Sequence, residues 1–448
     1  MARNVSDVID NARFNGYHLR IIMICGLLIL FDGFDLTAIS YAAPDLIKHL
    51  GINRSLIGPV FSAGLFGLTL GALGFGLIGD RLGIKPTFAL CCVVFGVFTL
   101  ATVVASSLTE LMVYRFIAGL GLGGASPLSV AYASDYCPKK VRTSVVMIMY
   151  INLSVGQIVA GYTYSTLAAF GWQAVFIVGG ILPLLLVPVM LLLMPDGLEH
   201  MVLRKAAPEK INAVLAKIEP SVPAVDTEFT IAKENKQGFQ LAELFRDGRA
   251  AVTAVLWCVF FTSLIAMYFF MNWIPTLLQG SGLDKTQIVI ITSALPFGGI
   301  LGTLVASTVV MKVSGFRTVA IGYFCAAIAM ALLSMAGSEF LLLAVGTLAV
   351  GMFLIGTQSV LNAVAAAVYP PTMRATGIGW GFGIGRIGSI ISPSIAGLLV
   401  ALHWQPADLF RIAALPTLAA CIAAYVVARL LASRAPARHE AAPVLARH

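Results

Sequence analysis

The sequence predicts an all-α membrane protein with twelve transmembrane helices arranged in two six-helix bundles. Of the 448 residues, 59% are hydrophobic and only 11% are charged, whereas a soluble protein carries about 25% charged residues. The apolar stretches have the length of a membrane-crossing helix, about 20 residues, and lack the ten-residue alternating pattern of an outer-membrane barrel. One long polar segment separates six of these stretches from the other six.

The order of the apolar stretches gives the domain organisation. The predicted spans are roughly 20–44, 56–79, 86–106, 110–134, 143–168 and 173–194 in the first half, and 250–278, 286–311, 317–336, 340–368, 375–402 and 408–432 in the second. The predicted parts are an N-terminal segment (1–19), a first bundle (20–194), a linker (195–249) with a short helix over 208–218, a second bundle (250–433) and a tail (434–448).

The basic residues predict how the chain is oriented in the membrane. The net charge is +8, and about 23 of the 29 Lys and Arg fall on the side of the predicted spans that carries both termini and the linker. The positive-inside rule places that side in the cytoplasm. We therefore interpret the charge as a topology signal and expect no nucleic-acid or protein partner.

Two aspartates, Asp32 and Asp35, interrupt the first apolar stretch. A carboxylate at the centre of a membrane helix costs about 2.5–3.5 kcal/mol on insertion, and it usually faces a cavity, a partner charge or a proton path. Asp35 has about the same depth as Arg115, whose span runs the other way, so we expect the two to pair; the alternative is that the Arg115 side chain extends to the outer membrane interface. Asp32 is nearer the midplane and is the better candidate to carry a proton. Phe34, between them, is a candidate for contact with a substrate.

Arg386 is the other basic residue deep in the predicted spans. Its planar guanidinium can donate two parallel hydrogen bonds to a carboxylate, so we expect it to bind an anionic substrate. The alternative is a permanent ion pair with Asp32 or Asp35. Arg115 is a second candidate for contact with the substrate.

Aromatic and amide side chains complete the predicted substrate site. Tyr268, Asn272 and Trp273 precede a proline in the seventh span, and this mixture suits an aromatic ring with a polar substituent. Gln358 and Asn362 in the tenth span are further candidates. The alternative for isolated amides is a role in holding helices together.

A charged loop between the second and third spans predicts a gate. It contains Gly76, Asp80, Arg81, Gly83 and Lys85 in the pattern GxxxDRxGxK. The glycine at 83 permits a tight turn, and an aspartate at 80 can meet the positive end of a helix from the other half. The alternative is a solvated turn that only sets topology.

Three further residues are assigned to the same gate. Asp135 and Arg142 flank the next loop on that side, and we expect them to join Asp80 and Arg81 in one ionic cluster. The third is Arg374, just before the eleventh span in the second half. The loop at 311–317 lacks an aspartate, so an equally strong second latch is not expected.

These motifs resemble a known family. The charged loop, together with the RxxxGxGxG pattern that starts at Arg115, is similar to motifs of the major facilitator superfamily. The Asp32-Gly33-Phe34-Asp35 segment and residues 272–275, 361–363 and 369–386 resemble its aromatic acid:proton symporters. The resemblance covers about 400 residues, in both halves.

The resemblance implies a function. The family's fold places the substrate site near the midplane between the halves, exposed alternately to each side. It implies proton-driven uptake of a benzoate- or hydroxybenzoate-like anion across a bacterial cytoplasmic (inner) membrane, for the catabolism of aromatic compounds. It also implies that both aspartates of the first span are needed. The sequence does not distinguish among benzoate, 3- or 4-hydroxybenzoate, protocatechuate and gentisate as the substrate.

Other classes of function are disfavoured by what the sequence lacks. It has no metal-spaced histidine cluster, nucleophile elbow or phosphate loop, so we expect no enzyme, metal or cofactor, and only the proton as coupling ion. The alternative is a proton antiporter of the same fold that exports organic anions or drugs. The fifth span reads Gly156-Gln157 without the Gly-Pro pair typical of such antiporters. The seven cysteines are expected to be buried free thiols.

Overall fold

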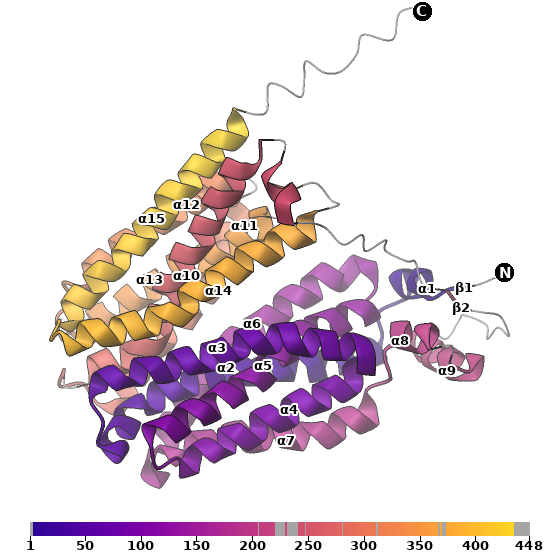
Figure 1. Ribbon diagram of the computed structural model, residues 1–448, viewed down its shortest axis with the longest axis horizontal. Helices are drawn as coiled ribbons and strands as arrows, with labels where there is room; N and C mark the ends of the chain where they lie inside the picture. The colour runs from indigo at the N-terminus through magenta and orange to yellow at the C-terminus, as the bar shows by residue number, and fades with distance from the viewer. Residues whose placement is uncertain are drawn as a thin grey trace, which may run out of the picture. The chain divides into compact units, whose positions relative to one another are not determined.

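The computed structural model describes residues 3–204, 206–219, 229–230, 241–246, 248–279, 281–310, 312–365, 368–369 and 373–433. Over these residues it is helical except for one pair of two-residue strands. Twelve helices are long and apolar enough to cross a membrane, which confirms the predicted fold class. The chain divides into two compact units, Met1–Asn235 and Lys236–His448, each with six of these helices (Figure 1).

The helices of the first unit agree with the predicted spans to within six residues at each end, and the largest difference is in α2, which is longer than predicted at both ends. Its long helices are α2 (Gly16–Leu50), α3 (Ile57–Leu82), α4 (Ile84–Ala101), α5 (Leu108–Tyr136), α6 (Lys139–Thr166) and α7 (Gln173–Leu193), with one-turn 3-10 segments η1 (Arg54–Leu56), η2 (Thr102–Val104) and η3 (Ala168–Phe170). The longest, α2, has 35 residues and ends at Gly51, which has a left-handed φ of 61°. That conformation is easily reached only by glycine.

Glycines allow the helices of the first unit to touch backbone to backbone. A Cβ on Gly71 of α3 would collide with the carbonyl of Leu120 in α5, and a Cβ on Gly33 of α2 with the carbonyl of Leu153 in α6. Small residues of this kind let membrane helices approach closely. Gly33 lies between Asp32 and Asp35, so it fixes the height at which the two carboxylates sit along α6.

A small layer covers the end of the first unit at which α2 begins. It contains α1 (Val5–Asn11), α8 (Leu198–Leu203), α9 (Pro208–Ile218) and strand β1 (Arg3–Asn4), paired in parallel with β2 (Phe229–Thr230) (Figure 1). The bounds of α9 confirm the short helix predicted at 208–218. Its apolar face is buried through Ile211, Leu215 and Ile218.

One asparagine ties this layer to the first spanning helix. The Asn15 Oδ1 accepts hydrogen bonds from the backbone N–H groups of Tyr17, at 2.9 Å, and His18, at 3.3 Å, and so caps α2. Its Nδ2 donates to the carbonyls of Lys217, at 3.1 Å, and Ile218, at 2.9 Å, at the last turn of α9. A single side chain thereby satisfies backbone groups at the ends of two helices.

The second unit repeats the same plan. Its helices are α10 (Ala250–Leu278), α11 (Lys285–Val310), α12 (Gly315–Leu333), α13 (Phe340–Ala365), α14 (Arg374–Ala401) and α15 (Pro406–Ala432), with a 3-10 segment η4 (Leu241–Phe245) before α10. Glycine again brings backbones together, since a Cβ on Gly302 of α11 would collide with the Met352 carbonyl of α13. The predicted tail at 434–448 lies outside the described residues.

The contact at Gly33 gives the first prediction. Gly33→Ala should destabilise the protein by about 1–3 kcal/mol, because the added methyl group overpacks the contact between α2 and α6. The measurement is the thermal unfolding of the purified protein in detergent. Gly74→Ala in α3 is the matched control, since no atom lies within 4 Å of its added Cβ. Equal stability of the two variants would contradict this account of the helix contact.

Candidate functional site

A buried ion pair joins α2 to α5 in the first unit. Arg115 Nη1 donates to Asp35 Oδ1 at 3.0 Å, and Arg115 Nη2 donates to Asp35 Oδ2. Arg115 is 4% exposed and Asp35 is 0% exposed. The predicted pair is therefore present, and it is buried away from solvent. Because both carboxylate oxygens and both terminal guanidinium nitrogens are used, the geometry is the strong bidentate one.

Two uncharged groups complete the surroundings of this pair. Thr99 of α4 donates its hydroxyl to Asp35 Oδ1 at 3.2 Å. The guanidinium carbon of Arg115 lies 5.9 Å from the centre of the Phe176 ring of α7, a favourable position for a cation over an aromatic face. Neither partner was predicted from the sequence. The expected contact of Arg115 with a substrate stays a prediction.

Asp32 lies in a different environment from Asp35. Its Oδ2 accepts a hydrogen bond from the hydroxyl of Ser126 in α5, and the residue is 6% exposed. Phe34 is buried within the first unit, and its ring faces Gly179 of α7. Of the two carboxylates one turn apart on α2, Asp35 is held by a cation in two hydrogen bonds, and Asp32 accepts a hydrogen bond from a hydroxyl. The predicted contact of Phe34 with a substrate stays a prediction.

In the second unit, Arg386 and Tyr268 come together. Arg386 Nη1 of α14 donates to the Tyr268 hydroxyl of α10 at 2.9 Å. One turn further along α10, Asn272 Nδ2 donates to the Tyr268 carbonyl at 2.7 Å. Three of the predicted substrate residues are thus neighbours, whereas Trp273 is fully buried in the helix packing. The guanidinium is half-buried and keeps further N–H groups with which to bind an anion.

The two predicted amides of α13 form a hydrogen-bonded chain with a tyrosine. Tyr323 of α12 donates its hydroxyl to Gln358 Oε1 at 2.8 Å, and Gln358 Nε2 donates to Asn362 Oδ1 at 3.2 Å. Tyr323 was not among the predicted residues, because an isolated tyrosine in an apolar span gives no signal of its contacts. The chain links α12 to α13, as expected for amides that hold helices together, and leaves the proposed role in substrate binding as a prediction.

The predicted gate begins with a sharp turn between α3 and α4. Gly83 has a φ of 95°, and its carbonyl accepts a hydrogen bond from the Thr87 hydroxyl at 2.8 Å. Arg81 is exposed, and its carbonyl accepts from Arg204 at 3.0 Å. Lys85 Nζ lies 3.9 Å from Asp196 Oδ1. These contacts connect the turn to the segment after α7.

Arg142 and Asp135 belong to the remaining part of the predicted gate. Arg142 pairs with Asp10 of α1 at 2.6 Å, and its place in an ionic cluster with Asp80, Arg81 and Asp135 stays a prediction. The sequence could not predict this partner, because Asp10 comes close to Arg142 only when α1 is folded against the end of α6. Asp135 lies in the last turn of α5 rather than in a loop.

Gly76 and Arg374 are two further residues assigned to the gate. Gly76 lies within α3, and Arg374 is exposed at the start of α14. Asp80 lies in α3, and its side chain is outside the described part of the structure. The gating roles of all these residues stay predictions.

The prediction that the cysteines are buried free thiols is confirmed only for some of them. Cys25, Cys91, Cys92 and Cys137 are buried, while Cys258 is exposed and Cys325 and Cys421 are half-buried. Burial raises the pKa of the Cys137 thiol to about 11, and the nearby Arg142 opposes the shift. Within the described residues, no group of three or more His, Cys, Asp or Glu side chains could hold a metal ion.

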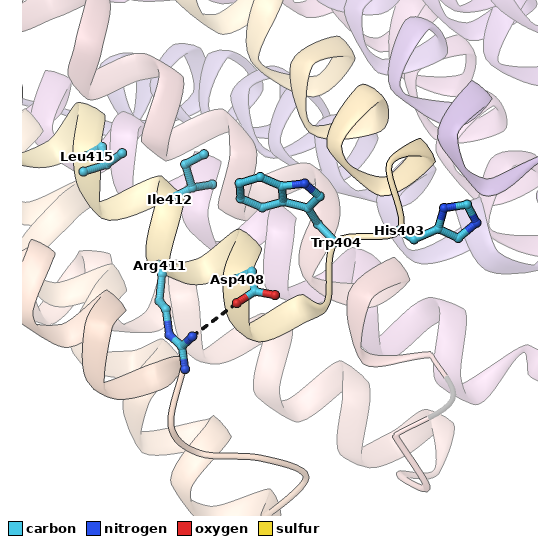
Figure 2. A pocket seen from close by; sticks show the side chains of 6 residues that line it. All are labelled: His403, Trp404, Asp408, Arg411, Ile412 and Leu415. Atoms are coloured by element: carbon cyan, nitrogen blue, oxygen red, sulfur yellow. Dashed lines mark hydrogen bonds and ion pairs between the residues drawn. The ribbon is translucent and has the colours of Figure 1, made fainter.

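A separate hollow lies where α14 turns into α15. It has a volume of about 580 Å³ and is lined by His403, Trp404, Asp408, Arg411, Ile412 and Leu415 (Figure 2). Arg411 already pairs with Asp408 at 3.2 Å and donates to the Ser334 hydroxyl, also at 3.2 Å. The hollow contains none of the predicted site residues, and its one arginine is held by an acid.

The described helices form a membrane protein of two six-helix units, and comparisons with known proteins identify its class. The model of the Major Facilitator Superfamily matches residues 25–356 and 256–447. The xylose transporter XylE of E. coli, in a partially occluded inward open conformation, superimposes with a TM-score of 0.72 at 16% identity, over 91% of this chain and 98% of that chain.

Proteins of similar sequence identify the branch of the superfamily. A gallate transporter of Pseudomonas putida is 35% identical over 94% of each chain. The 4-hydroxybenzoate transporter PcaK of Pseudomonas aeruginosa is 32% identical over 97% of each chain. A benzoate transport protein of Acinetobacter baylyi is 33% identical over 89% of this chain and 87% of its own. The chain belongs to the major facilitator superfamily and to its family of aromatic acid transporters, which confirms the resemblance seen in the sequence.

The buried ion pair gives the second prediction. Arg115→Gln should lower the free energy of unfolding by about 3–5 kcal/mol, because it leaves the Asp35 carboxylate buried without its cation. The double variant Asp35→Asn/Arg115→Gln removes both charges and should recover most of that loss. Thermal unfolding in detergent measures both. Arg411→Gln, which removes one partner of the exposed pair with Asp408, is the control and should change stability little.

Proposed function

We propose that this protein imports an aromatic carboxylate together with protons across a bacterial cytoplasmic membrane, with both termini in the cytoplasm. The different environments of Asp32 and Asp35 are the observation that carries the proposal. Asp35 is held in a bidentate ion pair, and a proton placed on it would leave Arg115 as a buried unpaired charge. Asp32 accepts a hydrogen bond from a hydroxyl, and that donor carries no charge to be stranded when the carboxylate is protonated. Asp32 is therefore the proton carrier in our proposal.

The substrate's carboxylate binds Arg386 in this proposal. Arg386 is held by a neutral hydroxyl, that of Tyr268, and a phenol can exchange partners with an arriving carboxylate at little cost. Tyr268 also offers an aromatic ring to the substrate. The names of the relatives, which include gallate, 4-hydroxybenzoate and benzoate transporters, support an aromatic acid as the substrate class.

The chemistry of such substrates explains why protons are needed. An aromatic acid with an ordinary carboxyl titrates near pH 4, so about one molecule in a thousand is neutral at pH 7. The anion that enters is opposed by an inside-negative potential worth about 2.3 kcal/mol per charge per 100 mV. A proton carried on Asp32 cancels that charge. The site is then exposed to the two sides of the membrane in turn.

Removal of the Asp32 charge tests proton coupling. In proteoliposomes with an acidic outside, Asp32→Asn should abolish the accumulation of radiolabelled gallate, 4-hydroxybenzoate or benzoate, while exchange of substrate across the membrane without a gradient continues. Asp45→Asn is the matched control, since Asp45 lies on the same helix thirteen residues beyond Asp32 and accepts a hydrogen bond from the Tyr164 hydroxyl. The proposal fails if the Asp32→Asn protein accumulates substrate as the wild type does. Accumulation driven only by the opposite gradient would favour the antiporter.

A conservative change at Arg386 tests substrate binding. Arg386→Lys keeps the charge but loses the planar fork, so the affinity for the same three acids should fall by about tenfold or more. The Kd is measured by thermal shift or calorimetry on purified protein. Ser389→Ala is the control, because Ser389 donates to the Arg386 carbonyl at 2.7 Å and does not alter the guanidinium. An unchanged Kd in Arg386→Lys would exclude bidentate capture of the carboxylate.

A further inference from the structure

Ser126 of α5 contacts the proposed proton carrier directly, and nothing in the sequence marked it. We infer that Ser126 is a positioning residue that orients the Asp32 carboxylate and controls when it binds and releases its proton. This inference rests on the proposed function, because it assigns a role in proton coupling to a residue outside the predicted site.

The hydrogen bond of Ser126 differs from those of most serine and threonine hydroxyls in the described part of the chain, although Thr99 likewise donates to a carboxylate on another helix. Serine and threonine inside a helix commonly donate to a carbonyl of their own preceding turn. Ser129, one turn further along α5, does this with Ala125 at 2.8 Å, and Thr69 of α3 does so with Leu65 at 2.9 Å. Ser126 instead donates across to Asp32 Oδ2 on α2. The contact therefore depends on how α5 lies against α2.

The position of Ser126 in α5 makes that contact adjustable. The next residue is Pro127, inside the helix. Proline has no N–H to donate to the carbonyl four residues earlier, that of Gly123, and a helix bends most readily at such a point. A small bend of α5 at Pro127 changes the distance between the Ser126 hydroxyl and the Asp32 carboxylate without breaking other backbone hydrogen bonds of α5.

The helices that pack against α2 carry few other ionisable residues near the level of Asp32. On α2 the nearest acid is Asp35, which Arg115 of α5 neutralises. Gly33 meets Leu153 of α6, so Tyr150, about one turn away, is the ionisable residue of α6 at this level. α7 contains no ionisable residue, and α3 has them only at its last turn.

The consequence for transport comes from the chemistry of the hydrogen bond. A hydroxyl that donates to a carboxylate stabilises the charged form. When α5 lies as it does here, Ser126 favours release of the proton from Asp32 to water. When a bend withdraws the hydroxyl, Asp32 takes a proton from water more readily. The Ser126 proton stays on its own oxygen throughout.

The test compares three variants of α5 in proteoliposomes. Uptake of gallate, 4-hydroxybenzoate and benzoate is measured against external pH at a fixed internal pH, and substrate exchange without a gradient is measured beside it. In Ser126→Ala the carboxylate loses a donor, so Asp32 binds its proton at higher pH, and the midpoint of uptake should rise by about one pH unit. Exchange should stay within about twofold of wild type. Ser126→Thr keeps the hydroxyl and Ser129→Ala leaves the contact intact, so both should keep the wild-type midpoint.

Each result supports or overturns the inference. A wild-type midpoint in Ser126→Ala, or an equal shift in Ser129→Ala, overturns it while the proposed function stands. A wild-type protein that shows no pH-driven accumulation overturns the proposed function and this inference with it. If Ser126→Ala does not give folded protein by thermal unfolding, Ser126→Cys replaces it, since a thiol is a weaker donor of similar size. Its midpoint should lie between those of wild type and of a variant without the donor, and an unshifted midpoint overturns the inference.

Discussion

The cost of placing charge in a membrane is the constraint on which this structure depends. Asp35 and Arg115 lie deep in apolar helices and each would be expensive alone, but their bidentate contact lets each compensate the other. The contact also fixes the height of α2 against α5, because Asp35 and Arg115 can meet in this geometry only when their two helices lie at matching heights. Thr99 and Phe176 contact this pair from α4 and α7.

Neighbouring residues of helix α2 face different helices. Asp32 and Asp35 reach α5, while Gly33 between them brings the backbone of α2 onto that of α6. A larger residue at 33 would move α2 away from α6 and shift both carboxylates. The segment Asp32-Gly33-Phe34-Asp35 therefore combines two chemical groups with the close contact that positions them, which explains why so short a sequence is so informative.

Contacts set by helix length and rise could be predicted from the sequence, whereas those that depend on helix rotation and packing could not. The Asp35–Arg115 pair was predictable because a rise of 1.5 Å per residue sets the depth of each residue once the spans are known. Ser126 and Thr99 were not, since hydroxyls are common in these helices and most bond to their own turn. The Arg142–Asp10 pair was missed because it needs α1 folded against the end of α6. Helix α9 was predicted with the bounds that the structure shows.

Charge balance across the spans limits how the proposed transport can work. Asp32 and Asp35 carry two negative charges deep in the apolar helices of the sequence, and Arg115 and Arg386 two positive ones, so the empty protein is neutral there. One aromatic anion adds a negative charge, and one proton restores neutrality. A carrier that moves only when this sum is zero must bind the proton and the anion together or neither, because any other combination leaves a charge to be carried through a medium of low dielectric. Under the proposed function, coupling then needs no contact between proton and substrate. It needs only that the charges of Asp32 and Arg386 both count in this sum. The charges of Asp35 and Arg115 cancel each other throughout.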